Sequence, residues 1–185
     1  MPKSKRASAQ PLAIELLEAD HRKVEGLFEQ YEAEKEGEED TKRAIAQRIC
    51  GELTVHAQVE EELFYPWLKE NLEEDDMEMV EEAYVEHAGA KDLIAQIEGA
   101  TEIDSTFDAK VKVLSEYIKH HVKEEENEIF EEVAEKREEL DELGQEMAAR
   151  KAELMEELGL AEEEEAPPAT ARGKKGQGES ARGSR

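Results

Sequence analysis

The sequence predicts an all-α protein: an antiparallel, up-down-up-down four-helix bundle with an additional C-terminal helix and disordered tails. Two observations along the chain predict this fold class. Glycine and proline are almost absent between residues 12 and 165, and apolar residues recur there at spacings of three and four, as they do on one face of a helix. A third observation sets the topology, because helical segments of about 25 residues joined by short loops favour antiparallel neighbours.

The first predicted helix runs from about Pro11 to about Lys35, since proline suits the first turn of a helix. Its predicted inner face carries apolar side chains at helical spacing: Ile14, Leu17, Val24, Phe28 and Tyr31. A loop through Gly37 follows, and either Asp40 or Thr41 is the predicted cap of the second helix.

The second predicted helix continues to about Tyr65, where Pro66 is expected to stop or kink it. Its predicted seam consists of Ile49, Leu53, Leu63 and Trp67. The third helix is expected to begin after a cap at Asp75 and to end near Gly99. Its predicted inner residues are Val80, Ala83, Ala90, Ile94 and Ile97.

The fourth predicted helix begins at Asp104 or Ser105, both of which are good capping residues. Its expected inner residues are Phe107, Val111, Leu114, Ile118 and Ile129. A fifth segment runs from about Glu139 to a stop at Gly159, with apolar residues Leu143, Met147, Leu154 and Leu158.

The predicted domain organisation follows from these segments and from the composition of the two ends. It consists of a basic, disordered N-terminus at residues 1–10, a four-helix bundle at 11–138, a helical extension at 139–159 and a low-complexity, disordered tail at 160–185.

Charge and composition exclude several classes of function. The chain has 50 acidic and 24 basic side chains and a net charge of −26, and 8 of the basic side chains lie in the two ends, residues 1–11 and 166–185. Such an acidic body is expected to bind neither nucleic acid nor an anionic membrane. The sequence has one cysteine, which cannot form an internal disulfide, and it lacks a run of about 18 apolar residues. A cytoplasmic location is therefore predicted.

The histidines are the most informative residues. Each of the four bundle helices is predicted to place one histidine within its apolar stripe: His21, His56, His87 and His121. Glu60 and Glu125 each follow one of these histidines by four residues and so share its helix face. Two carboxylates and four imidazoles buried in one bundle would be very costly if nothing compensated them.

Distances from the connecting loops place the four histidines at a similar height, within about one helical turn. Four imidazoles and two carboxylates are too many ligands for one tetrahedral zinc ion and suit two first-row ions bridged by carboxylates. The predicted metal ligands are His21, His56, Glu60, His87, His121 and Glu125. Two non-heme iron ions fit this mixture of nitrogen and oxygen donors best, with manganese or zinc as alternatives. His120 remains an alternative to His121, which is preferred because it continues the seam of the fourth helix.

Four stretches of the chain carry these residues in a fixed order: DHRKVEGLFEQYE around His21, HAQVEEELFYP from His56, EEAYVEHAGAKDLI around His87 and HHVKEEENEIF from His120. In this order, over about residues 12–135, the chain resembles the hemerythrin-like HHE cation-binding proteins of bacteria. The resemblance implies a hemerythrin-like bundle with the four histidines as terminal iron ligands and with Glu60 and Glu125 as bridges.

Two features depart from the oxygen-carrying members of that family. Those carriers have a further histidine one turn after the residue that matches His87, where this chain has Lys91. They also use an aspartate five residues after the histidine of the fourth helix, whereas Glu125 is four residues after His121. One iron is therefore expected to lack a histidine and to have a more open coordination sphere, which disfavours reversible oxygen storage.

The resemblance implies a small set of activities and partners. These are binding of dioxygen or nitric oxide, reaction with peroxide, sensing of these molecules together with a protein partner, or handling of iron. No conventional enzyme acting on an organic substrate is predicted, because no nucleophile or phosphate-binding loop is recognisable. Two alternatives of other classes remain: a structural zinc protein, and a metal-free helical interaction protein.

Several further residues receive simpler interpretations. Tyr65 and Trp67 are expected to pack at the end of the bundle, and Cys50 is expected to be an inert, partly buried thiol. Tyr31 and Tyr84 are candidates to reach the site, although core packing is the preferred interpretation. The glutamates next to the predicted ligands are expected to form a solvated face: Glu61, Glu62, Glu124 and Glu126. Glu61 or Glu124 is an alternative contributor to the site if a bridge shifts by one residue.

Overall fold

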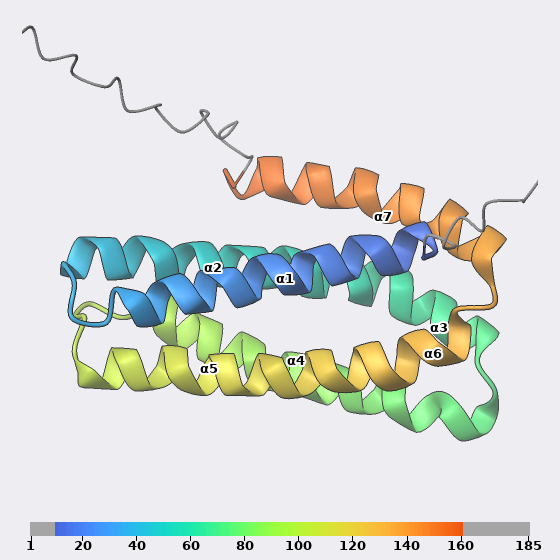
Figure 1. Ribbon diagram of the computed structural model, residues 1–185, viewed down its shortest axis with the longest axis horizontal. Coiled ribbons are helices and arrows are strands. Elements are labelled where there is room, and N and C mark those ends of the chain that lie inside the picture. The colour runs from blue at the N-terminus through green and yellow to red at the C-terminus, as the bar shows by residue number, and fades with distance from the viewer. Residues whose placement is uncertain (1–9, 161–185) are drawn as a thin grey trace, which may run out of the picture.

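The computed structural model describes residues 10–160, and over that range every regular element is a helix. The four long helices α1 (Leu12–Ala33), α2 (Glu39–Val59), α4 (Met77–Glu98) and α5 (Ser105–Glu124) run alternately in opposite directions (Figure 1). The predicted fold class, a bundle with one extra helix, is thereby confirmed. Residues 1–9 and 161–185, which include nearly all of the predicted disordered tails, lie outside the described residues. None of the described helices is long and apolar enough to cross a bilayer.

The extra helix α7 (Arg137–Glu157) lies along α1 and α2 on the outer side of the bundle (Figure 1). It buries one apolar stripe there: Leu140, Leu143, Met147, Leu154 and Met155. Leu158, the last apolar residue of the predicted fifth segment, is 49% exposed because the helix ends before it and Gly159 turns the chain with a positive φ of 65°. Leu160 packs against the core instead, and Arg48 donates a hydrogen bond to its carbonyl.

The helix caps agree only partly with the predictions. Asp104 caps α5, because its carboxylate accepts hydrogen bonds of 2.9 Å from the N–H groups of Thr106 and Phe107. The prediction that Asp40 or Thr41 caps α2 is wrong, since α2 already begins at Glu39. The prediction for α4 is also displaced, because the 3₁₀ turn η2 (Glu74–Asp76) leads into that helix and puts Asp76 at its boundary.

Two π-helical turns, η1 (Glu60–Phe64) and η3 (Glu125–Ile129), interrupt the second and fourth long helices. Both begin at a glutamate of the predicted site, and the next N–H after each turn bonds to the carbonyl of that glutamate, five residues back. Such wide turns are rare and occur mostly at functional sites. Helical spacing in the sequence does not predict these turns.

The π turns explain why Pro66 does not end the second helix. The chain continues as α3 (Tyr65–Asn71), just as the short helix α6 (Phe130–Val133) follows the other π turn. A proline ring normally clashes with the carbonyl four residues before it, and a wider turn relieves that clash. Of the two expected outcomes at Pro66, a stop or a kink, the stop is therefore wrong.

The π turn η1 also changes which side chains face the core after it. Leu63 and Trp67, predicted for the seam, are only half-buried, whereas Phe64, Tyr65 and Leu68 are completely buried. One extra residue in the turn rotates all later side chains around the helix axis relative to a regular α-helix. A seam extrapolated at constant helical spacing therefore misses the buried residues beyond Glu60.

The core consists of two apolar clusters. One lies toward α3, α6 and α7 and contains Ile14, Leu17 and Phe64. The other lies toward the opposite end of the bundle and contains Val24 and Leu114. The four predicted histidines occupy positions on α1, α2, α4 and α5 between the clusters, so a buried polar layer divides the core.

Gly144 allows α7 to approach α1 closely. A Cβ atom at Gly144 would lie 2.5 Å from the backbone nitrogen of Ala13 and 2.7 Å from the carbonyl carbon of Leu12. We expect Gly144→Val to destabilise the protein by about 1–3 kcal/mol, because backbone atoms cannot move aside as flexible side chains do. Thermal denaturation followed by circular dichroism measures the loss.

Gly26 in α1 is the matched control, because an added Cβ would meet nothing within 4 Å there. Gly26→Ala should raise stability by about 0.5–1 kcal/mol through higher helix propensity. Equal stability of the Gly144→Val variant and the wild type would contradict the close packing of α7.

Candidate metal centre

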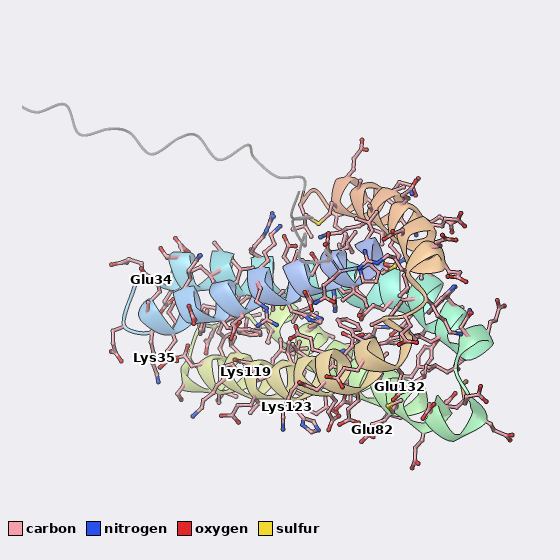
Figure 2. All side chains as sticks on the ribbon, turned by 45° about the vertical axis from the view of Figure 1, so that its right-hand side comes forward. Glu34, Lys35, Glu82, Lys119, Lys123 and Glu132 are labelled. Atoms are coloured by element: carbon pink, nitrogen blue, oxygen red, sulfur yellow. The ribbon has the colours of Figure 1, made fainter. Side chains whose placement is uncertain are left out.

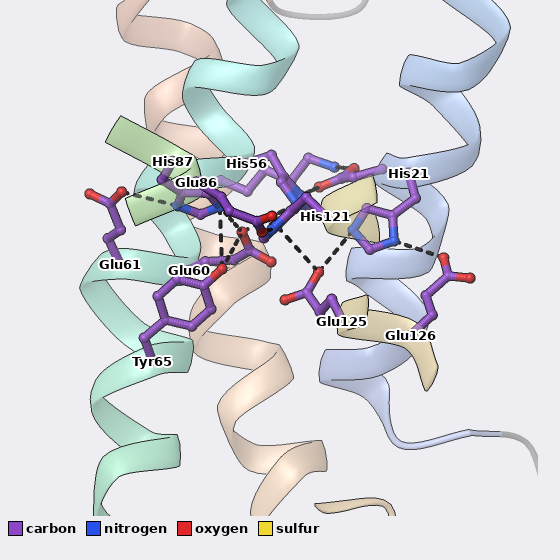
Figure 3. Close-up of polar contacts among 12 residues, drawn as sticks. His21, His56, Glu60, Glu61, Tyr65, Glu86, His87, His121, Glu125 and Glu126 are labelled. Carbon is purple, nitrogen blue, oxygen red and sulfur yellow. Dashed lines mark hydrogen bonds and ion pairs between the residues drawn. The ribbon is translucent and has the colours of Figure 1, made fainter. Parts of the chain in front are cut away.

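The six predicted site residues lie together in one layer of the bundle (Figure 3). All six side chains are buried, with at most 6% of each residue exposed: His21, His56, Glu60, His87, His121 and Glu125. Their nitrogen and oxygen atoms form two groups, each with its members within 4.8 Å of one another. The layer therefore has the donor atoms and the spacing for two ions.

The first group contains His21, His56, Glu60 and Glu125. Nε2 of His21 lies 3.1 Å from Oε2 of Glu125, and Nε2 of His56 lies 3.3 Å from Oε2 of Glu60. These contacts come from three helices and bring two imidazoles and two carboxylates to one point, which is a donor set typical of first-row transition metals.

The second group contains Glu60, His87 and His121. Nε2 of His87 lies 3.3 Å from both Oε2 of Glu60 and Nε2 of His121. Oε2 of Glu125 is 4.0 Å from Nε2 of His121, so this carboxylate also borders the second group. Glu60 belongs to both groups and Glu125 adjoins both, which is the placement that bridging ligands require.

Each histidine directs Nε2 toward the centre and Nδ1 toward a carboxylate of a neighbouring helix (Figure 3). The four pairs, with their Nδ1 to oxygen distances, are His56 with Asp20 at 3.6 Å, His87 with Glu61 at 3.0 Å, His121 with Glu86 at 2.8 Å and His21 with Glu126 at 2.8 Å. A carboxylate on the far nitrogen fixes the ring orientation and tautomer and makes the inner nitrogen a better metal ligand.

The outer carboxylates were not identified from the sequence. Glu61 and Glu126 were assigned to a solvated face, and this assignment is wrong because each contacts a buried histidine. A sequence signal did exist, since Asp20 and Glu86 directly precede a site histidine while Glu61 and Glu126 directly follow a site glutamate. Assigning each to its histidine required the arrangement of the helices.

Tyr65 is a further residue of the site. Its hydroxyl lies 3.2 Å from Nε2 of His87 and 3.5 Å from Oε2 of Glu60, and the residue is completely buried. The prediction of simple end packing for Tyr65 is therefore wrong. Tyr31 donates its hydrogen bond to Asp108 instead of reaching the site, and Tyr84 packs edge-on against the Tyr65 ring.

Electrostatics separate the two bridging candidates. Burial and the neighbouring charge of Glu125 raise the pKa of Glu60 well above its ordinary value. Burial alone would raise the pKa of Glu125 too, but the contact with His21 and the charges of His121 and His21 lower it. The pKa shifts of the two carboxyl groups therefore run in opposite directions, upward for Glu60 and downward for Glu125.

The histidines divide in a corresponding way. Burial lowers the pKa of His56, and burial together with the neighbouring His121 lowers the pKa of His87 to about 4. Burial opposes charge on His21 as well, but its contacts with Glu125 and Glu126 raise its pKa. Neutral imidazole is the form that binds a metal, so His56 and His87 are ready to do so at neutral pH.

The structure places His121 in the buried layer and His120 outside it, with 57% of the His120 side chain exposed. Cys50 is buried away from these groups in the second apolar cluster. Burial raises the pKa of the Cys50 thiol to about 12, which keeps it protonated and unreactive at neutral pH.

The residues of the layer fit metal ions because several of their buried atoms have no hydrogen bond. Among the described residues, the buried side-chain atoms of this layer without a hydrogen bond are Nε2 of His21, both ring nitrogens of His56, Oε1 of Glu60 and both oxygens of Glu125. Buried polar atoms are nearly always satisfied in folded proteins. Cations between these donors would satisfy most of them at once.

A small cavity adjoins the histidines on the side of the second apolar cluster. It has a volume of about 20 Å³ and is bounded by all four site histidines and by apolar side chains: Val24, Leu53, Ala57, Ala90, Ile94 and Ile118. Space of this size holds about one molecule of the size of water. Lys91 also borders it, and its ammonium group contacts both oxygens of Glu61 at 2.6 Å.

Comparison with known proteins agrees with this geometry. Residues 12–133 match the model of the hemerythrin HHE cation-binding domain. The chain is also 27% identical over 147 residues to a DNA nickase of Nostoc sp. (strain PCC 7120 / SAG 25.82 / UTEX 2576), a match that covers 78% of this chain and 40% of that protein. No solved structure matches the chain significantly. Since the domain model covers most of the chain, this protein belongs to the hemerythrin HHE cation-binding domain family.

Proposed function

We propose that the protein holds two non-heme iron ions in the His/Glu layer and that dioxygen, nitric oxide or peroxide binds or reacts there. The observation that carries this proposal is the small apolar cavity directly against the four histidines. A diatomic molecule fits such a space, whereas a larger organic substrate does not. The apolar lining also disfavours water, which protects a reactive centre from side reactions.

The proposed ligands divide into terminal and shared groups. His21 and His56 would hold one ion, His87 and His121 the other, and Glu60 and Glu125 would be shared between them. A pair of Fe(II) ions would supply up to two electrons to a small oxidant. The chain supplies three or four donors per ion, which leaves room for an added ligand on the side of the cavity.

The remaining residues of the site control orientation and charge. Lys91 neutralises Glu61, which in turn fixes the ring of His87 through Nδ1. Tyr65 has a pKa raised well above its ordinary value by burial and by the charge of Glu60, so its hydroxyl keeps its proton and donates to Glu60. These contacts lie around the second group, which has the fewer protein donors and is the proposed position for the added ligand.

Anaerobic loading with Fe(II), followed by metal analysis and absorption spectroscopy, tests the proposal. Two irons per chain and a new charge-transfer band after addition of air, nitric oxide or peroxide to separate samples are the expected results. The relative rates then rank the three reactants. A colourless protein that binds zinc and reacts with none of the three would support the structural zinc alternative. A protein that binds no metal and still has its helical fold would support the metal-free interaction protein.

Filling the cavity tests whether the reactant uses it. Ala90→Leu adds three carbon atoms to the cavity wall, so iron loading should stay at two per chain while the reaction with nitric oxide or dioxygen slows. Ala95→Leu is the matched control, because Ala95 lies on the same helix with its side chain exposed. Equal reaction rates in both variants would show that the reactant does not use this cavity.

The match to the DNA nickase does not alter this proposal. We infer that the common feature is the helical metal-binding domain, since the matched segment is less than half of that protein. The net charge of −26 opposes DNA binding by this chain.

A further inference from the structure

The bundle contains the same site pattern twice. Asp20 precedes His21 on α1 as Glu86 precedes His87 on α4. On α2 and α5 a histidine is followed after four residues by a glutamate that begins a π turn. In both halves the outer carboxylate of the first helix faces the histidine of the second helix, Asp20 facing His56 and Glu86 facing His121.

The two halves differ on their outer sides. On the side of α1 and α2, α7 covers the bundle, and Lys151 of α7 forms an ion pair with Asp20. Val55 and Val59, which directly precede His56 and Glu60, are both 1% exposed. This half of the layer is therefore closed to solvent by an apolar surface and by a lysine ammonium group on its outer carboxylate.

On the side of α4 and α5, polar residues occupy the corresponding places of the pattern. His120 precedes His121 as Val55 precedes His56, and Glu124 precedes Glu125 as Val59 precedes Glu60. Nε2 of His120 lies 3.2 Å from Oε1 of Glu124 and 3.6 Å from Oε1 of Glu86. One imidazole and two carboxylates thus lie within 4.8 Å of one another at the surface, a donor set suited to a divalent cation.

A second observation connects this outer cluster with the centre. A cavity of about 20 Å³ lies between α4 and the α5–η3 segment, and its lining includes five carboxylates: Glu82, Glu86, Glu124, Glu125 and Glu128. Glu82 and Glu128 are exposed at its outer end, and the Glu82 side chain projects outward on the side opposite α7 (Figure 2). At its inner end Glu125 is 1% exposed, and neither of its oxygens has a hydrogen bond from the described residues.

Glu86 links the outer and inner groups directly. Its Oε1 faces Nε2 of His120, while its Oε2 contacts Nδ1 of His121 at 2.8 Å. Asp20, the matching carboxylate, has its outer oxygen occupied by Lys151 instead. The chain therefore blocks one side of the layer with a cation of its own and leaves acceptor oxygens available on the other side.

We propose that Glu86, His120 and Glu124 form an outer divalent-cation site, and that ions pass from it along the carboxylate-lined cavity to the inner centre. This inference rests on the proposed dinuclear centre, to which it adds the route of metal uptake. Clustered carboxylates at the mouth of a narrow cavity raise the local concentration of cations and the rate at which they bind. Glu125 then offers the next pair of oxygens along the route.

Cobalt(II) uptake by the metal-free full chain tests the route, because cobalt bound by nitrogen and oxygen donors absorbs visible light. Wild-type protein is expected to bind two ions tightly and a third one weakly in equilibrium dialysis. The double variant His120→Ala/Glu124→Gln should lose only the third ion. In stopped-flow absorption it should fill the inner centre about tenfold more slowly, the lower end of the range for electrostatic steering.

Glu116→Gln is the control for charge, since Glu116 lies on the same helix α5, is exposed and belongs to none of these groups. It should bind three ions and fill at the wild-type rate. Equal slowing in the control and the double variant would overturn the proposal, because general charge and not the outer site would then set the rate. A third ion and a wild-type rate in the double variant would overturn it as well.

The experiment also separates this proposal from the proposed function. Failure of the inner centre would appear as wild-type protein that does not take up two tight ions, whatever happens at the surface. Failure of the outer site alone would leave two tight ions and an unchanged uptake rate in the double variant. Circular dichroism of the double variant checks that its helices remain, as is expected for substitutions of an exposed and a half-buried residue.

Discussion

Replacing Glu60 by alanine is expected to abolish the binding of two metal ions per chain. Glu60 is completely buried and is the residue shared by both inner donor groups. Its removal leaves one group with three donors and the other with two histidines, and it also removes a negative charge that offsets two dications. Metal analysis after loading with Fe(II) and desalting should give at most one ion per chain.

His56→Ala should have a similar effect on the first group, which then keeps His21, Glu60 and Glu125. Glu62→Ala is the matched control, because Glu62 lies in the same π turn but points outward to an exposed ion pair with Arg150. Loss of such a pair costs at most about 1 kcal/mol, so this variant should still bind two ions. Two ions per chain in both the Glu60→Ala and the His56→Ala variant would show that this ligand assignment is wrong.

Removal of the metal is expected to lower the thermal midpoint of unfolding on the order of 10 °C. Ligands that bind only the folded state stabilise it by about 4 kcal/mol at a thousandfold excess over the dissociation constant, and 1 kcal/mol corresponds to about 2–4 °C in a domain of this size. The reason lies in the buried layer, where oxygens and nitrogens without a hydrogen bond remain when the ions are absent. Thermal denaturation with and without a chelator measures the difference.

This difference should grow as the pH rises from about 6 to 8. The raised pKa of Glu60 favours its protonated form in the metal-free protein, and bound ions displace protons from their ligands, so metal binding should strengthen as the pH rises. In the metal-free protein, Glu60 lowers the free energy of unfolding as the pH rises. The reason is that this carboxyl group ionises more readily in the unfolded chain than in the folded one. A difference that is independent of pH would contradict the raised pKa of Glu60.

The sequence predicted the bundle well because the helices with the clearest spacing of apolar residues are regular α-helices. The inward faces of α1 and α4 are buried as expected, including Leu17 and Val24 on α1 and Val80 and Ile94 on α4. The prediction failed beyond Glu60, where a π turn changes the register and Phe64 and Leu68 face the core instead of Leu63 and Trp67. Helical periodicity cannot indicate a turn that departs from it.

For the candidate metal centre, the sequence by itself determined the donor residues that come together. The spacing of the histidines in the apolar stripes and the repeated His-x-x-x-Glu pattern depend only on helix geometry, which is local and regular. The tertiary structure decided which carboxylate faces which Nδ1 atom, how Tyr65 reaches His87, and which side of the layer α7 closes. These features depend on which helices are neighbours and on how far each is rotated, and contacts between residues far apart in the chain set both.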